Sequence, residues 1–119
     1  MIASRLLAAA VIVAVSAPAA AVFAHARLVR STPAAGAVVA SPGVVALTFS
    51  ERMVPAFSGF DLVDASGREA AVRTTVSEDG KTLSGRLSRP LAAGAWTVNW
   101  RIASGDGHRM TGSYGFTVR

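Results

Sequence analysis

The chain has 119 residues, no cysteine and a formal net charge of +5 at pH 7. This length supports one domain, and the lack of thiols excludes disulfides, thiolate metal sites and redox-active cysteine pairs. The cationic residues are scattered along the chain and do not alternate with aromatic residues, which argues against a nucleic-acid-binding surface.

Residues 1–24 have the pattern of a secretory signal peptide. Arg5 supplies the positive charge, residues 6–15 are apolar, and Val22 and Ala24 occupy the −3 and −1 positions of a cleavage site. Cleavage after Ala24 leaves a domain of residues 25–119, in which the 11 remaining cationic side chains outnumber the 7 anionic ones by four. We therefore expect export to the periplasm as a soluble mature protein. The alternatives are an uncleaved membrane anchor and a cut after Ala26.

The rest of the chain consists of short runs of apolar and alternating residues between Gly, Pro, Ser and Asp. No stretch repeats its apolar residues with a helical period over a useful length. This spacing predicts an all-β fold: an antiparallel Greek-key β-sandwich or barrel, cupredoxin-like or immunoglobulin-like, with about seven strands. The predicted strands are residues 28–32, 44–50, 57–63, 70–76, 82–88, 95–103 and 110–118.

Three segments give more specific predictions. Residues 34–43 are expected to form a loop, from which Val38 or Val39 reaches the core. Residues 77–80 contain Asp-Gly between alternating runs, which predicts a hairpin turn. In the last two strands the large apolar residues fall on one face, and Gly112 leaves room for a bulky neighbour. The residues expected on the buried face of 95–103 are Trp96, Val98, Trp100 and Ile102.

The connection between the last two predicted strands holds a carboxylate and an imidazole on either side of a glycine. Asp106 and His108 are two residues apart, so a strand would point both side chains the same way. Gly107 also lets the backbone bend, which would allow both groups to approach one ion. The alternative is an ordinary turn, in which Asp106 accepts hydrogen bonds from its own backbone and His108 is exposed.

The only other histidine, His25, becomes the first residue if the signal peptide is cut after Ala24. Its α-amine and its imidazole Nδ1 can then chelate one metal ion, once the amine has lost its proton. Together with Asp106 and His108 they make three nitrogens and one oxygen, a set that suits Cu(II). The alternative is a solvated histidine in a frayed terminus.

Other residues are interpreted as structural. Met53 and Met110 are isolated, and we expect them to fill gaps in the core instead of binding Cu(I). Glu51 is expected to be a solvated carboxylate at a strand end, although it could lie near the metal. No serine lies in a nucleophile-elbow motif, so the sequence does not predict an enzyme.

An ordered set of motifs extends over nearly all of residues 25–119. It begins with residues 25–28 and 31–34, continues through 47–51 and 57–59, and ends with 91–101, Ser104, Asp106, His108 and 112–118. In this order the motifs resemble the CopC (PcoC-like) family of exported bacterial copper-binding and copper-resistance proteins. Single motifs are weak, but the whole series, with a signal cut before a histidine, is specific.

The resemblance implies a cupredoxin-like fold and a Cu(II) site made by His25, Asp106 and His108. It implies a periplasmic copper carrier, buffer or resistance factor that acts beside a CopD-like membrane protein. Two features of this sequence differ from those of some family members. The third mature residue is Arg27 instead of histidine, and the segment after Val63 is a short turn instead of a methionine-rich loop.

Two other functions remain as alternatives at this point. A metal-free immunoglobulin-like domain would serve protein interactions, because β-sandwiches have many binding roles. A copper monooxygenase would use His25 as a histidine brace, but the chain is short and shows no flat aromatic face for a substrate. In that enzyme, Asp106 would also crowd the open coordination position.

Overall fold

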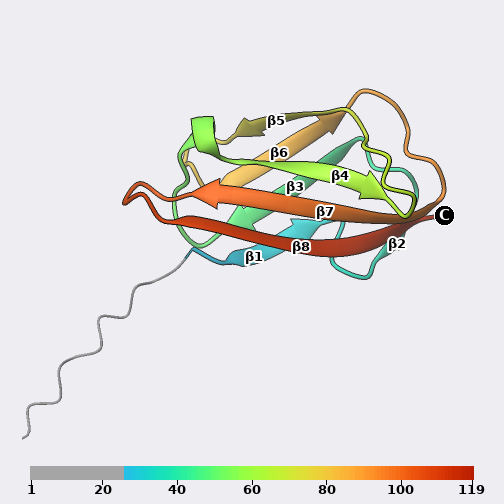
Figure 1. Ribbon diagram of the computed structural model, residues 1–119, viewed down its shortest axis with the longest axis horizontal. Coiled ribbons are helices and arrows are strands. Elements are labelled where there is room, and N and C mark those ends of the chain that lie inside the picture. The colour runs from blue at the N-terminus through green and yellow to red at the C-terminus, as the bar shows by residue number, and fades with distance from the viewer. Residues whose placement is uncertain (1–25) are drawn as a thin grey trace, which may run out of the picture.

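A computed structural model describes residues 26–119, in which two four-stranded β-sheets pack face to face (Figure 1). The predicted signal peptide and His25 lie outside these described residues. The all-β sandwich prediction is confirmed. The strands are β1 Leu28–Thr32, β2 Val38–Val39, β3 Val44–Phe49, β4 Gly59–Asp64, β5 Val72–Val76, β6 Thr82–Leu87, β7 Gly94–Ala103 and β8 Arg109–Val118, with one 3-10 turn, η1 Pro55–Phe57.

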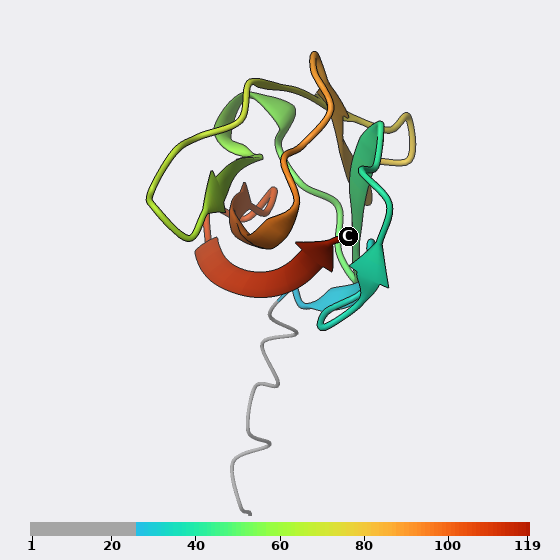
Figure 2. The same ribbon diagram turned by 90° about the vertical axis from the view of Figure 1, so that its right-hand side faces the viewer.

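The chain alternates between the two sheets. One sheet has the order β1-β3-β6-β5 and the other β2-β8-β7-β4, so the chain passes from one sheet to the other several times. Among the strands of residues 26–119, only β5–β6 and β7–β8 are joined as hairpins within a sheet. Figure 2, viewed from the end where the C-terminus lies, shows the strands curving around a common interior.

Alternating residues of the two sheets fill that interior. All four residues expected on the buried face of β7 are at most 9% exposed. Gly112 lies opposite Trp100 in the β7–β8 register. A Cβ atom at Gly112 would come within 2.2 Å of the Trp100 ring, so the glycine is needed for the indole to pack. The space predicted beside this glycine is therefore confirmed.

The segment 34–43 is not entirely a loop. Val38 and Val39 form a short strand that pairs in parallel with β8, which raises the strand count to eight and adds one parallel pair to the antiparallel sheets. Val39 packs against the core, whereas Val38 is 58% exposed. The run is too short for its alternation to be recognised, and only its place beside β8 makes it a strand.

Two strands begin later than predicted. Residues 55–57 form the turn η1, which starts at Pro55 because proline fixes a φ angle suited to the first position of a helix. Strand β4 therefore begins at Gly59 and not at Phe57. Strand β5 begins at Val72, because residues 68–70 turn back and pair with β4, where the Ala70 N–H donates to the Leu62 carbonyl.

The start of β1 and the connection between β7 and β8 lie at the same end of the molecule, opposite the C-terminus (Figure 1). The segment after β3 joins them. Met53 forms an isolated bridge with Ser104, and the Val54 N–H donates to the Ala103 carbonyl over 2.7 Å. Residues distant in sequence thus meet at this end of the sandwich.

Candidate metal centre

The connection between β7 and β8 is a tight, internally hydrogen-bonded turn. The Ser104 N–H donates to the His108 carbonyl over 2.9 Å, and the Gly107 N–H donates to the Ser104 carbonyl over 3.0 Å. Gly107 has a φ angle of +89°, which residues with a Cβ atom rarely adopt. The sequence Asp-Gly-His folds in this way because the glycine accepts that conformation at the point where the chain reverses.

The turn brings Asp106 and His108 into direct contact. His108 Nδ1 lies 2.7 Å from Asp106 Oδ2, and the His108 N–H donates to Asp106 Oδ1 over 3.1 Å. The side chain of His108 is 52% exposed and that of Asp106 is 62% exposed, so an ion in solution can reach both groups. The segment therefore forms the ordinary turn and also brings the two side chains into contact, while their binding of one ion stays a prediction.

The carboxylate of Asp106 is held in its charged form. The Ser104 hydroxyl donates to it, and so do the ring and the backbone N–H of His108. These hydrogen bonds, with that of Ser104 the strongest, lower the pKa of Asp106 well below its usual range. The Asp106 carboxylate is thus ionised at every pH at which the protein is expected to work.

The described chain begins at the same end and is firmly anchored there. Ala26 is 3% exposed and belongs to the core. The Arg27 N–H donates to Ser50 Oγ over 3.0 Å, and the Ser50 N–H donates to the Arg27 carbonyl over 3.0 Å. Ala26 is buried, and both the N–H and the carbonyl of Arg27 are hydrogen-bonded to Ser50. The backbone is therefore fixed one residue after His25.

Within residues 26–119, no three or more His, Cys, Asp or Glu side chains are grouped to hold a metal ion. The described part of the predicted site is the pair of Asp106 and His108, and the remaining predicted donors belong to His25. Met53 is 5% exposed and packs in the core, in agreement with its predicted structural role. Glu51 is partly exposed and directly follows Ser50, which bonds Arg27.

Two serines support the site, Ser50 and Ser104, which were named from the sequence only as members of family motifs and were given no role of their own. Ser104 could have been found, because a serine two residues before an aspartate is a common turn arrangement. Ser50 could not, since its contact with Arg27 joins residues 23 apart. Only the pairing of β1 with β3 brings those two segments together.

Comparison with known proteins places the chain in a family. Residues 28–119 match the family model of the CopC domain. The chain belongs to the CopC family. Relatives named copper resistance protein C include one from Xanthomonas campestris pv. juglandis, 35% identical with 92% of this chain and 91% of the relative covered. Another, from Pseudomonas syringae pv. tomato, is 44% identical, with 81% and 82% covered.

Solved structures of CopC-family proteins have the same fold. PcoC, a methionine-rich copper resistance protein from Escherichia coli, is 37% identical, with a TM-score of 0.74 over 81% of this chain and 100% of that one. CopC from Methylosinus trichosporium OB3b is 33% identical and also has a TM-score of 0.74, over 79% and 93% of the two chains. The predicted family and fold are thus confirmed.

Proposed function

We propose that this protein is an exported Cu(II)-binding protein of the copper-resistance type, which carries or buffers copper in the periplasm. The contact between Asp106 and His108, at the end where the chain begins, is the observation that carries the proposal. The names of its relatives support copper as the ion, since several are called copper resistance protein C.

The proposed ligands are the α-amine and imidazole of His25, the Asp106 carboxylate and the His108 imidazole. Covalent geometry keeps the Cα of His25 about 3.8 Å from that of Ala26, which is buried at this end. Two ligands about 2.0 Å from one ion and at right angles are about 2.8 Å apart. In the metal-free protein the ring proton of His108 bridges the 2.7 Å between Asp106 Oδ2 and His108 Nδ1, and this spacing suits such a pair once the ion has displaced that proton.

The donor set favours Cu(II) over Cu(I). Imidazole, amine and carboxylate donors suit Cu(II), whereas Cu(I) prefers thiolates and thioethers. The chain has no cysteine and three methionines, one of which is Met1. Of the other two, Met53 is buried in the core and Met110 packs against it. A methionine-based Cu(I) site is therefore not proposed here.

The proposed setting is the periplasm, after removal of residues 1–24. Within residues 26–119, no helix is long and apolar enough to cross a membrane. A CopD-like membrane protein is the proposed recipient or donor of copper, by resemblance to the family. Four protein donors around the ion leave little room for a substrate, and we propose binding and transfer without catalysis.

A competitive Cu(II) titration of the exported protein tests the site. One form begins at His25, and the other has one glycine inserted between Ala24 and His25, with both starts verified by mass spectrometry. Moving the amine away from the imidazole should weaken binding at least 100-fold, about 2.7 kcal/mol. His108→Ala should produce a loss of similar size in the first form.

Each other outcome would contradict part or all of the proposed function. Equal affinity of the two forms would exclude the amine as a ligand. A lack of Cu(II) binding by both would leave the metal-free interaction domain. Copper-dependent turnover of a polysaccharide with peroxide would instead identify a histidine-brace monooxygenase.

A further inference from the structure

The sheet β1-β3-β6-β5 carries positive charge and no negative charge. None of its four strands contains Asp or Glu, and its charged residues are Arg30, Arg73 and Arg86. All three side chains are exposed. Residues 26–119 hold four more cationic than anionic side chains. The strands of this sheet have a net charge of +3, which is most of that excess.

All three arginines point away from the core. Arg30 pairs with Thr48, which alternates with the buried Leu47 and Phe49. Arg86 pairs with both Val44 and Arg73, and it follows the buried Gly85. Cross-strand partners lie on the same side of a sheet. The outer surface of this sheet is therefore the arginine face, defined by Arg30, Arg73 and Arg86.

Two arginines outside the arginine face, Arg101 and Arg109, have a side-chain partner in the described chain. Arg101 Nη1 lies 3.5 Å from Asp61 Oδ2, and Arg109 stacks on Phe57 with its Cζ 5.6 Å from the ring centre. Among residues 26–119, no salt bridge involves the arginine face. Arg73 and Arg86 are even direct cross-strand partners, an arrangement that repels unless anions lie between or above them.

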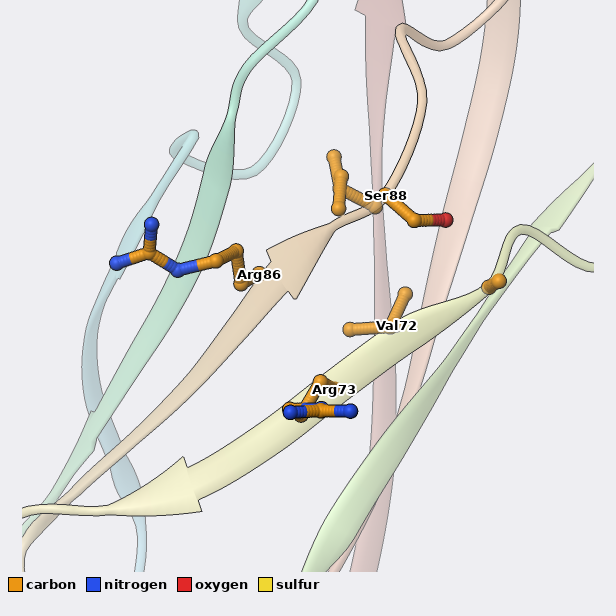
Figure 3. A pocket seen from close by; sticks show the side chains of 6 residues that line it. Val72, Arg73, Arg86 and Ser88 are labelled. Carbon is orange, nitrogen blue, oxygen red and sulfur yellow. The ribbon is translucent and has the colours of Figure 1, made fainter.

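The charges are spread over the sheet and do not converge on one point. Arg73 and Arg86 border a shallow pocket where β5 begins and β6 ends, together with Val72 and Ser88 (Figure 3). In Figure 3 the Arg86 side chain extends away from Arg73, so the two guanidinium groups are separated. Arg30 lies on β1, which is separated from the β6 strand of Arg86 by β3. Such an array suits many anions on a surface better than one small anion.

The other residues of the arginine face point to phosphate as the anion. Guanidinium and hydroxyl groups both donate to phosphate oxygens, and arginine does so through two N–H groups. No aromatic residue occurs in β1, β5 or β6, and Phe49 of β3 is buried. Protein interfaces usually need aromatic anchors, which this face lacks. Its hydroxyl residues are Thr32, Thr48, Thr75, Thr82 and Ser84, of which Thr48 and Thr82 are hydrogen-bonded to each other over 3.2 Å, so that only one of these two hydroxyls donates outward.

We propose that the arginine face docks on a bilayer surface that contains anionic phospholipids. The three guanidinium groups and the hydroxyl groups would bind lipid phosphates, and the sheet would lie along the membrane plane. The metal-binding turn belongs to the other sheet, between β7 and β8, so docking leaves it uncovered. This inference is independent of copper and holds for the metal-free protein.

Vesicle flotation of the exported protein tests the docking. The probes are vesicles of pure phosphatidylcholine and vesicles with 40% phosphatidylglycerol, an assay composition of about two anionic lipids in five. The variant R30Q/R73Q/R86Q removes the three positive charges of the arginine face. Each arginine should contribute about fivefold to partitioning, so the variant should bind anionic vesicles about 100-fold more weakly. Binding of the unmodified protein should also weaken as salt is raised.

The matched control is R68Q/R101Q/R119Q, which lowers the net charge equally but leaves the arginine face intact. It should retain most of the binding. An equal loss in the two variants would overturn the proposal, because net charge alone would then explain the attraction. Equal binding to both kinds of vesicle, or none to either, would also overturn it.

Binding of the protein to polyglutamate beads through the arginine face, without binding to vesicles, would overturn membrane docking and indicate an acidic protein as the partner. Thermal unfolding of each variant verifies that it is folded.

Discussion

Asp106 accepts hydrogen bonds from both Ser104 and His108, and it is the residue on which the proposed metal centre depends most within residues 26–119. The carboxylate orients the imidazole and keeps its own charge at the same time. Its side chain is exposed, so a substitution can change metal binding without opening a cavity in the core.

Asp106→Asn is therefore expected to weaken Cu(II) binding by about 10- to 100-fold, because it removes a charged ligand and loosens the partner of His108. Competitive titration measures the loss. Asp64→Asn is the matched control, since Asp64 accepts similar hydrogen bonds from Ser66 and Arg68 in the turn after β4. If the control lost as much affinity as Asp106→Asn, a local role of Asp106 would be contradicted.

Gly112 and Gly115 provide a second pair of variants at the residue scale. Gly112→Ala places a Cβ atom 2.2 Å from the Trp100 ring and should destabilise the protein by about 1–3 kcal/mol. Gly115→Ala meets only the Trp96 carbonyl at 3.5 Å, an ordinary contact. Urea unfolding should show a clear loss for the first and a small change for the second. Equal losses would mean that the strand, not the ring contact, requires glycine.

At the scale of elements, the β5–β6 hairpin combines a favourable turn with an unfavourable pair. Residues 77–80 form the predicted turn, in which the Ser77 hydroxyl donates to Asp79 and Gly80 has a φ angle of +75°. Arg73 and Arg86 then lie opposite each other on the exposed face of the hairpin. The repulsion is tolerated because both side chains reach into solvent.

Arg73→Gln should therefore stabilise the protein by about 0.2–1 kcal/mol at low salt, and the gain should shrink as salt is raised. Arg86→Gln should give a similar gain, and the double variant should add little to either. Urea unfolding of the four proteins forms a double-mutant cycle. Fully additive gains would show that the two arginines do not interact.

At the scale of the whole molecule, acid should affect copper binding and folding in separate pH ranges. Hydrogen bonds from Ser66, Ser77 and Ser104 are the main cause of the lowered pKa values of Asp64, Asp79 and Asp106 respectively. A carboxyl group whose pKa is lower when folded stabilises the fold above its unfolded pKa, about 3.9. That stability is lost as the pH falls through the folded pKa values.

The free energy of unfolding should consequently stay nearly constant from about pH 8 to pH 5 and decrease below about pH 4. Cu(II) affinity should already decrease between about pH 8 and pH 5, where amines at chain termini and imidazoles generally take up protons. Parallel urea unfolding and Cu(II) titrations over this range measure both. A copper loss that coincides with unfolding would contradict ligand protonation as its cause.

The sequence by itself determined the elements and the chemistry of the candidate donors. Alternation in β7 and β8, the Asp-Gly turn of residues 77–80 and the Asp-Gly-His segment are local patterns, and local patterns are governed by neighbours in the chain. For this reason the sandwich, the buried tryptophans and the pairing of Asp106 with His108 could be predicted. Strand ends such as Gly59 and Val72 were not predicted, because the turn η1 delays β4 and the pairing of residues 68–70 with β4 delays β5.

Tertiary structure alone decided which distant segments share a surface. The parallel pairing of β2 with β8 and the contact of Ser50 with Arg27 join residues whose separation leaves no periodic trace in the sequence. The arginine face arises in the same way, from the order β1-β3-β6-β5, which gathers three scattered cations on one side. Residue types determine what each group can bind, but sheet order and register determine which groups bind together.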